Sequence, residues 1–201
     1  MRVIKGLVMA IGVIGILVIL ALLTGLYLYS LSPSILGKAV PVTVTADAAQ
    51  SFDDKIKSAD IEIKSAIEAG ENREIILVIT ENEANSKLAQ MLAESQLPFK
   101  RGSLINFGDG YFLTYAVLEA PVIDAKTATI GRIEIVDGKP KIVIDEFNLG
   151  KLALPESAKA RVEQLANIML SSRLADVDLD IARVEFKDRQ VTITGTTKTG
   201  D

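Results

Sequence analysis

The chain has 201 residues, with 22 Lys or Arg against 26 Asp or Glu, and it contains no His, Cys or Trp. Without Cys or His there can be no disulfide, no thiol nucleophile, no Ser-His-Asp triad and no zinc site built on thiolate or imidazole. A formal net charge of −4 argues against nucleic acid as a partner, because binding to phosphate requires a basic face.

The apolar residues are concentrated at the N-terminus. None of the residues from Gly6 to Gly37 is charged, and residues 7–31 are almost wholly apolar. A helix of that length spans about 37 Å, enough to cross a hydrocarbon core of about 30 Å. A cleaved signal peptide is the alternative, but its apolar stretch is normally only ~7–15 residues long and ends at a small-residue cleavage site. We therefore expect an uncleaved transmembrane helix. Tyr27 and Tyr29, near its C-terminal end, should lie at the membrane–water interface on that side.

The charges around this stretch predict its orientation. Arg2 and Lys5 precede it, and only Lys38 follows closely, which places the N-terminus in the cytoplasm by the positive-inside tendency. We expect a single-pass protein of the cytoplasmic membrane with its C-terminal domain outside. The predicted division is an anchor and juxtamembrane segment over residues 1–38, a short linker over 39–46 and an extracytoplasmic domain over 47–201.

The external domain begins with a predicted helix over residues 47–69, where apolar residues recur at helical spacing before Gly70. A β-rich run over 74–80 follows. Thr80 and Glu83 then match the capping box S/T-x-x-E, which predicts that a second helix begins there and ends before Pro98. Its apolar stripe consists of Ala84, Leu88, Met91 and Leu92.

Residues 104–147 predict strands joined by tight turns at Asp109-Gly110 and Asp137-Gly138. Pro155 suits the first turn of a third helix. A last hairpin joins residues 177–186 to residues 191–196. The expected apolar face of the third helix consists of Ala158, Val162, Leu165, Ala166, Met169 and Leu170. This order predicts an α+β fold with one twisted antiparallel sheet and the helices packed on one side of it.

Few patterns indicate chemistry. Residues 176–180 have D-x-D-x-D spacing, but Ile181 stands where a calcium loop needs Gly, so a strand with a solvated acidic face is the preferred interpretation. Glu83 has a capping role, and we expect Glu81 and the pair Asp145-Glu146 to be solvated charges at strand ends. Nucleophile elbows, P-loops and dinucleotide-binding fingerprints are absent. We expect no catalytic site, no metal site and no cofactor.

The remaining candidate for a site is an apolar groove between the second helix and the segment around residues 147–154. Unbranched Leu and Met side chains suit a deformable surface of this kind, although each is also a plausible core residue. The candidate groove residues are Leu88, Met91, Leu92, Leu97, Phe99, Leu149, Leu152 and Leu154.

Short motifs in this domain resemble a bacterial family. FDDKI, LVITENEANSKLAQML, IVDGKPKIVI, FNLGKLALP and VEFKDRQVTITG occur in that order between residues 52 and 195. Together they look like the membrane-anchored proteins related to the LmeA and YpmS groups, which are similar to tubular lipid-binding (TULIP-like) domains. Arg189 stands where a turn Gly would be expected in the closing hairpin, which questions the type of turn there.

The resemblance implies a curved antiparallel sheet wrapped on long helices, with an apolar channel for acyl chains between them. It also implies binding or shuttling of phospholipid close to the membrane, without catalysis. An alternative function is an anchored module that binds an envelope protein by strand addition at a sheet edge, without a lipid channel. The protein partner, if any, is unknown from the sequence.

Overall fold

The computed structural model describes residues 27–28, 31–94, 102–118, 124–174 and 177–198. The N-terminal part of the predicted span therefore lies outside the described residues. Within the described residues, no helix is long and apolar enough to cross a membrane. The elements in chain order are η1 (Ser34–Lys38), α2 (Ala46–Glu68), β1 (Glu74–Thr80), α3 (Glu81–Ala93), β2 (Leu104–Gly108), β3 (Tyr111–Leu118), β4 (Ala125–Val136), β5 (Lys139–Leu149), β6 (Leu152–Ala153), α4 (Glu156–Leu174), β7 (Leu179–Lys187) and β8 (Gln190–Thr197).

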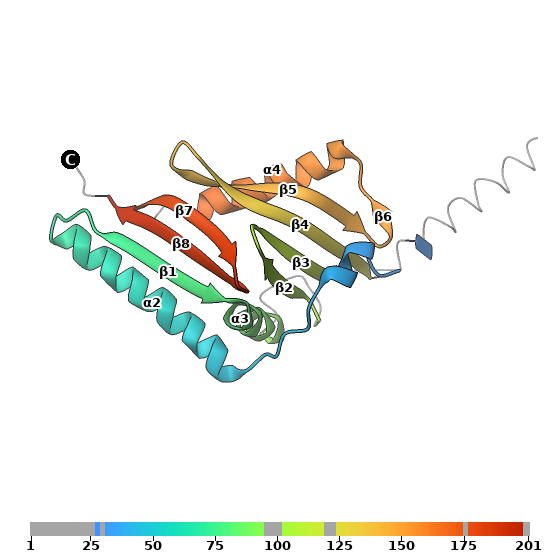
Figure 1. Ribbon diagram of the computed structural model, residues 1–201, viewed down its shortest axis with the longest axis horizontal. Coiled ribbons are helices and arrows are strands. Elements are labelled where there is room, and N and C mark those ends of the chain that lie inside the picture. The colour runs from blue at the N-terminus through green and yellow to red at the C-terminus, as the bar shows by residue number, and fades with distance from the viewer. Residues whose placement is uncertain (1–26, 29–30, 95–101, 119–123, 175–176, 199–201) are drawn as a thin grey trace, which may run out of the picture.

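The predicted α+β class is confirmed, but the strands form two antiparallel sheets where we expected one. A three-stranded sheet has the order β1-β8-β7, and a five-stranded sheet has the order β2-β3-β4-β5-β6 (Figure 1). The first sheet joins β1 from the start of the domain to the closing hairpin, so that sheet forms only when both ends of the domain come together.

The predicted hairpin turns are confirmed at both sheets. Asp137 and Gly138 join β4 to β5 with φ values of 52° and 71°. Asp188 and Arg189 join β7 to β8 with φ values of 51° and 59°. Positive φ at both central residues is the mark of a type I′ turn, which matches the twist of the flanking strands. The last hairpin thus keeps this turn type although neither of its central residues is Gly.

The main core lies between the two sheets. Phe186 of β7 packs against Phe107 of β2 and Phe112 of β3, with ring centroids 5.5 Å and 5.8 Å apart. Ile79 of β1 and Val191 of β8 complete the buried part of this cluster. Aromatic pairs at such separations contribute about 0.5–1.5 kcal/mol each beyond the area that they bury. This cluster holds the three-stranded sheet against one face of the five-stranded sheet.

The three long helices lie along strands at the sheet edges. Figure 1 shows α2 beside β1, and α4 behind β5 on the side of the sheet away from η1. α3 contacts α2, β1 and β2, and α4 contacts β5. A helix beside an edge strand covers backbone groups that would otherwise be free to pair with another chain.

Residues 31–45, which we call the strap, join the described end of the predicted span to α2. The strap crosses one face of the five-stranded sheet, where Ile35 is only 5% exposed and packs against Leu113, Ala128 and Ile130. The backbone of Val40 forms two hydrogen bonds with the side chain of Asn106 in β2. Hydrogen bonds at Val40 and Thr45 thus tie the predicted linker to the domain, although the side chains of Val40 and Val44 remain half exposed.

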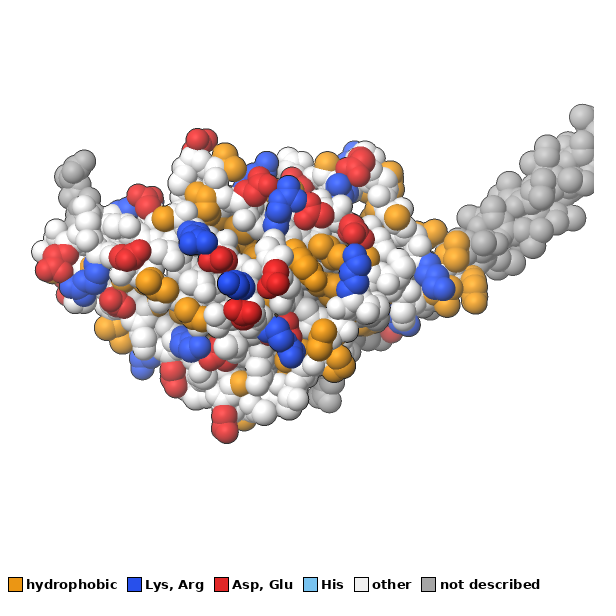
Figure 2. All heavy atoms as spheres, in the orientation of Figure 1, with side chains coloured by type: hydrophobic (Ala, Val, Ile, Leu, Met, Phe, Trp, Pro, Cys, Tyr) orange, Lys and Arg blue, Asp and Glu red, His pale blue; other side chains and the backbone are white. Residues whose placement is uncertain are grey.

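The surface carries both signs of charge. On the face shown in Figure 2, Lys and Arg side chains are interspersed with Asp and Glu side chains over both sheets. Some opposite charges on the surface form ion pairs, as Lys38 and Glu146 do at 3.5 Å. The face therefore presents no broad basic field of the kind that a nucleic-acid backbone requires.

Candidate functional site

Strand register divides the five-stranded sheet into two faces. The strap covers the face that bears Leu113, Ala128 and Ile130. We call the opposite face the helix face. Directly paired residues place three rows on it: Phe107, Phe112 and Gly131; then Ile105, Thr114, Thr129 and Phe147; then Ala116, Thr127, Leu149 and Leu152. The first row packs under Phe186, whereas the third row lies two rows further on, about 13 Å along the strands.

The predicted groove residues of the second half lie at this far end of the helix face. Leu149 and Leu152 are partners across the β5–β6 turn, and both are half-buried. Leu154 follows β6, and its backbone N–H donates to the carbonyl oxygen of Phe147 at 3.1 Å. The side chains of Phe147 and Leu154 are half-buried as well. These residues form an apolar group beside the β5–β6 turn.

The predicted groove residues of the first half lie on α3. Leu88, Met91 and Leu92 share one stripe with Ala84, which packs against the core cluster between the sheets. Leu92 is buried, and Leu88 and Met91 are half-buried. α3 lies along β2, whereas Leu149, Leu152 and Leu154 lie on or next to β5 and β6. The two groups of candidate residues are therefore separated by the width of the sheet, which is about 14 Å for three strand spacings. The other two candidates, Leu97 and Phe99, lie outside the described residues.

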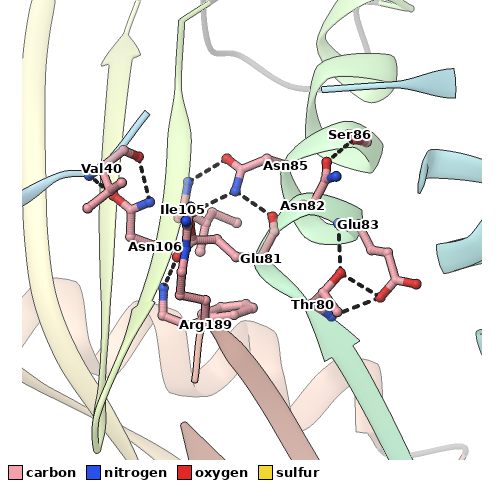
Figure 3. Close-up of polar contacts among 11 residues, drawn as sticks. Val40, Thr80, Glu81, Asn82, Glu83, Asn85, Ser86, Ile105, Asn106 and Arg189 are labelled. Carbon is pink, nitrogen blue, oxygen red and sulfur yellow. Dashed lines mark hydrogen bonds and ion pairs between the residues drawn. The ribbon is translucent and has the colours of Figure 1, made fainter. Parts of the chain in front are cut away.

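Polar side chains of the segment TENEANS, at the start of α3, bind β2 and the β7–β8 turn (Figure 3). The capping box predicted for Thr80 and Glu83 is confirmed: each side chain accepts from the backbone N–H of the other residue. The Ser86 hydroxyl donates to Asn82 and accepts from the backbone N–H of Thr45 at the end of the strap. The polar residues of this motif therefore hold the domain together.

Our prediction that Glu81 would be solvated is wrong. Its side chain is only 3% exposed, accepts from the backbone N–H of Phe107 at 2.7 Å and pairs with the guanidinium of Arg189 at 2.6 Å. The backbone N–H of Glu81 also donates to the carbonyl oxygen of Arg189. The sequence could not show this, because the partner in the β7–β8 turn is more than a hundred residues away. The ion pair also explains why Arg occupies a turn position with positive φ.

Glu83 has the most perturbed carboxyl group of the described residues. Desolvation by burial raises its pKa, but hydrogen bonds from Lys55, Ser51 and Thr80 together outweigh this effect and lower the pKa to about 2. Lys55 also donates to the carbonyl oxygen of Val78 at 2.9 Å, on the β1 edge that α2 covers. A glutamate held ionised by so many donors is a structural anion and a poor proton carrier at neutral pH.

Three asparagine side chains bind the backbone of a neighbouring segment with both their donor and their acceptor. Asn85 of α3 binds Ile105 of β2 in this way, with distances of 2.6 Å and 2.8 Å. Asn106 binds Val40 of the strap, with distances of 2.9 Å and 3.0 Å. A carboxamide reproduces the donor and acceptor of a peptide group, so Asn85 replaces a missing strand partner at the edge of β2, and Asn106 holds the strap on the sheet in the same way.

The third such contact closes the edge of β5. Asn167 of α4 accepts from the N–H of Ile142 at 2.7 Å and donates to its carbonyl oxygen at 2.8 Å, while Glu163 accepts from the N–H of Ile144. α4 and α3 therefore use the same arrangement, Glu and Asn four residues apart, to cover an edge strand. The sequence signal is the spacing E-x-x-x-N, which an exposed helix face would also show.

This contact corrects the predicted apolar face of α4. Leu165 is 62% exposed, Ile168 is 57% exposed and Met169 is 67% exposed. The physical reason is that the helix packs on a strand edge, where polar side chains can satisfy backbone groups, and so turns Glu163 and Asn167 towards the sheet. Part of the apolar stripe consequently faces away from the domain.

The remaining acidic candidates do not converge. Arg132 pairs with both Asp145 and Glu134, and Asp180 pairs with Lys198. Among the described residues there is no group of three Asp or Glu placed to hold a metal ion. Asp176, the first residue of the acidic alternation, lies outside those residues.

Searches against protein-family models, curated proteins and solved structures found nothing that matches this chain.

Proposed function

We propose that this chain is a membrane-anchored, non-enzymatic domain that binds or shuttles phospholipid at the outer face of the cytoplasmic membrane. The observation that carries the proposal is the apolar group of Phe147, Leu149 and Leu152 on the helix face, at the end of the sheet where the chain enters from the predicted span. Burying an acyl chain is worth about 0.8 kcal/mol per CH₂, so a short apolar surface can hold a lipid without a polar catalyst.

The alternative function, strand addition by an envelope protein, has less support. Such a partner needs an edge strand with free backbone groups. Of the described edges, β1 is covered by α2, β2 by α3 and β5 by α4, each with at least one side chain bound to the strand's backbone. At β7, the N–H of Gly110 donates to the carbonyl oxygen of Phe186. Strand addition at β1, β2 or β5 would therefore have to displace bonds that the fold already makes, and the outermost strand of the larger sheet, β6, has only two residues.

The test is whether phospholipid travels with the domain. A chain of residues 27–201 keeps every contact of the strap described above, and we expect native mass spectrometry to find phospholipid bound to it after purification from cells. Leu149→Gln should lower the bound fraction, whereas Val136→Gln, at an exposed site in the β4–β5 hairpin, should not. Circular dichroism checks that both variants are folded. A folded wild-type domain that never carries lipid would refute the proposal.

A further inference from the structure

The β5–β6 turn lies against the end of the predicted span. The backbone N–H of Lys151, in this turn, donates to the carbonyl oxygen of Leu28 at 2.9 Å. Leu28 belongs to the last turn of the apolar stretch of residues 7–31, which we expect to end at the membrane interface. With the span ending where we expect, this hydrogen bond puts the turn at the level of the lipid headgroups.

The strap is bound to the five-stranded sheet at several successive positions. The side chain of Asn148 donates to the Ser34 hydroxyl at 3.1 Å, Ile35 is buried on the sheet, and Asn106 binds both backbone groups of Val40. These contacts follow one another along the strap within a dozen residues of Leu28. Core packing and hydrogen bonds thus fix residues 34–40 of the strap on the five-stranded sheet, close in the chain to Leu28.

The side chains at this turn have the chemistry that a phospholipid needs. Lys151 is exposed, and no ion pair engages it within the part of the chain that the structure describes. A lysine ammonium on its flexible stem suits a phosphate group. Leu149 and Leu152 flank the turn as direct partners and are half-buried. A cation for the headgroup thus lies beside two side chains that suit an acyl chain.

We propose that the β5–β6 turn is the surface by which the domain docks on the bilayer that holds its own span. Lys151 binds the phosphate of an anionic phospholipid there, and Leu149 and Leu152 form the entry for its acyl chain. The inference rests on the proposed lipid-binding function and adds the place where the lipid enters. Lys139, at the other end of the 11-residue strand β5, lies about 33 Å away and should not touch the bilayer.

The absence of native cysteine allows a direct test on the full chain. A fluorophore is attached to Ala153→Cys, an exposed site next to the turn that leaves Lys151 in place, or to Lys139→Cys as the matched control. The labelled protein is reconstituted into phosphatidylcholine vesicles that contain headgroup-nitroxide lipid, with or without phosphatidylglycerol. We expect most of the fluorescence at position 153 to be quenched and little at position 139. Equal quenching at the two sites, or none at position 153, would overturn the docking surface.

The role of the lysine is tested in the same vesicles. One lysine near an anionic surface corresponds to about a fivefold preference for anionic lipid. Lys151→Gln should abolish the gain in quenching that phosphatidylglycerol produces, whereas Lys141→Gln, an exposed lysine further along β5, should keep it. A gain that survives in Lys151→Gln would overturn the assignment of the phosphate to this lysine.

These results are separable from those on the proposed function. Phospholipid that co-purifies with the domain while the probe at position 153 stays bright would overturn the docking surface and leave lipid binding standing. Quenching at position 153 by a domain that never carries lipid would support docking and refute the lipid-binding function.

Discussion

Replacing Glu83 by Gln tests the buried anion that joins α2, β1 and α3. Gln keeps the shape of the side chain and can still complete a capping box, so the change removes mainly the charge. In the folded protein the carboxylate accepts from Lys55 and Ser51 as well as from Thr80. Its side chain is only 8% exposed, so water does little to replace these donors.

The size of the effect follows from the pKa. Lowering the pKa of Glu83 from 4.5 to about 2 corresponds, at about 1.36 kcal/mol per pH unit, to about 3 kcal/mol of folding free energy. Because the folded pKa is depressed, this stability is present above pH 4.5 and is lost as the pH falls towards 2. The value is an upper limit, since Lys55 is 37% exposed and partly screened by solvent.

The assay is urea denaturation of the full chain in a mild detergent at pH values from 7 to 2.5. Glu83→Gln should be less stable than wild type by up to about 3 kcal/mol at pH 7, and the difference should shrink steadily below pH 4.5. Glu62→Gln, at an exposed glutamate of α2, is the matched control and should change little. A difference between wild type and Glu83→Gln that is the same at pH 7 and pH 3 would refute the argument.

Two further predictions concern the edge contacts and the strained turn. Asn167→Ala removes both hydrogen bonds to the backbone of Ile142 and should cost about 1–3 kcal/mol, with much faster hydrogen exchange at the Ile142 amide; unchanged protection there would show that the contact is dispensable. Asp188→Gly should stabilise the protein by up to about 1 kcal/mol in thermal denaturation, because Gly adopts positive φ without strain. Arg189→Gly relieves the same strain but leaves Glu81 without its guanidinium, so it should destabilise; equal gains from both glycine variants would contradict the role of the ion pair.

Several elements could be predicted because their signals are local. The capping box at Thr80 and Glu83 lies within four residues, and the structure confirms the helix that it starts. The turn at Asp137-Gly138 likewise joins the two strands on either side of it. The strand over residues 74–80 has the predicted bounds. In each case a short stretch of chain contains all the partners that its conformation requires.

The contacts that decided the architecture join residues far apart in the chain. Nothing near Glu81 in the sequence indicates that Arg189 will neutralise it, and the apolar stripe of α4 does not reveal that the helix will instead turn Asn167 towards an edge strand. The candidate groove shows the same limit. The sequence indicated apolar residues on α3 and on β5–β6, but it did not show that the width of the sheet separates them.

The sequence by itself determined the apolar N-terminal stretch and the absence of Cys and His chemistry, because both follow directly from composition. It also determined the α+β class and the hairpins, because their periodicity and turn signals lie in neighbouring residues. Only the tertiary structure decided that there are two sheets, that asparagine side chains cover edge strands of the five-stranded sheet, and that the strap is packed on the domain. These outcomes depend on which distant segments can satisfy one another's backbone groups and bury one another's apolar side chains. The hydrogen bond between Lys151 and Leu28, on which the proposed docking surface rests, is of that kind.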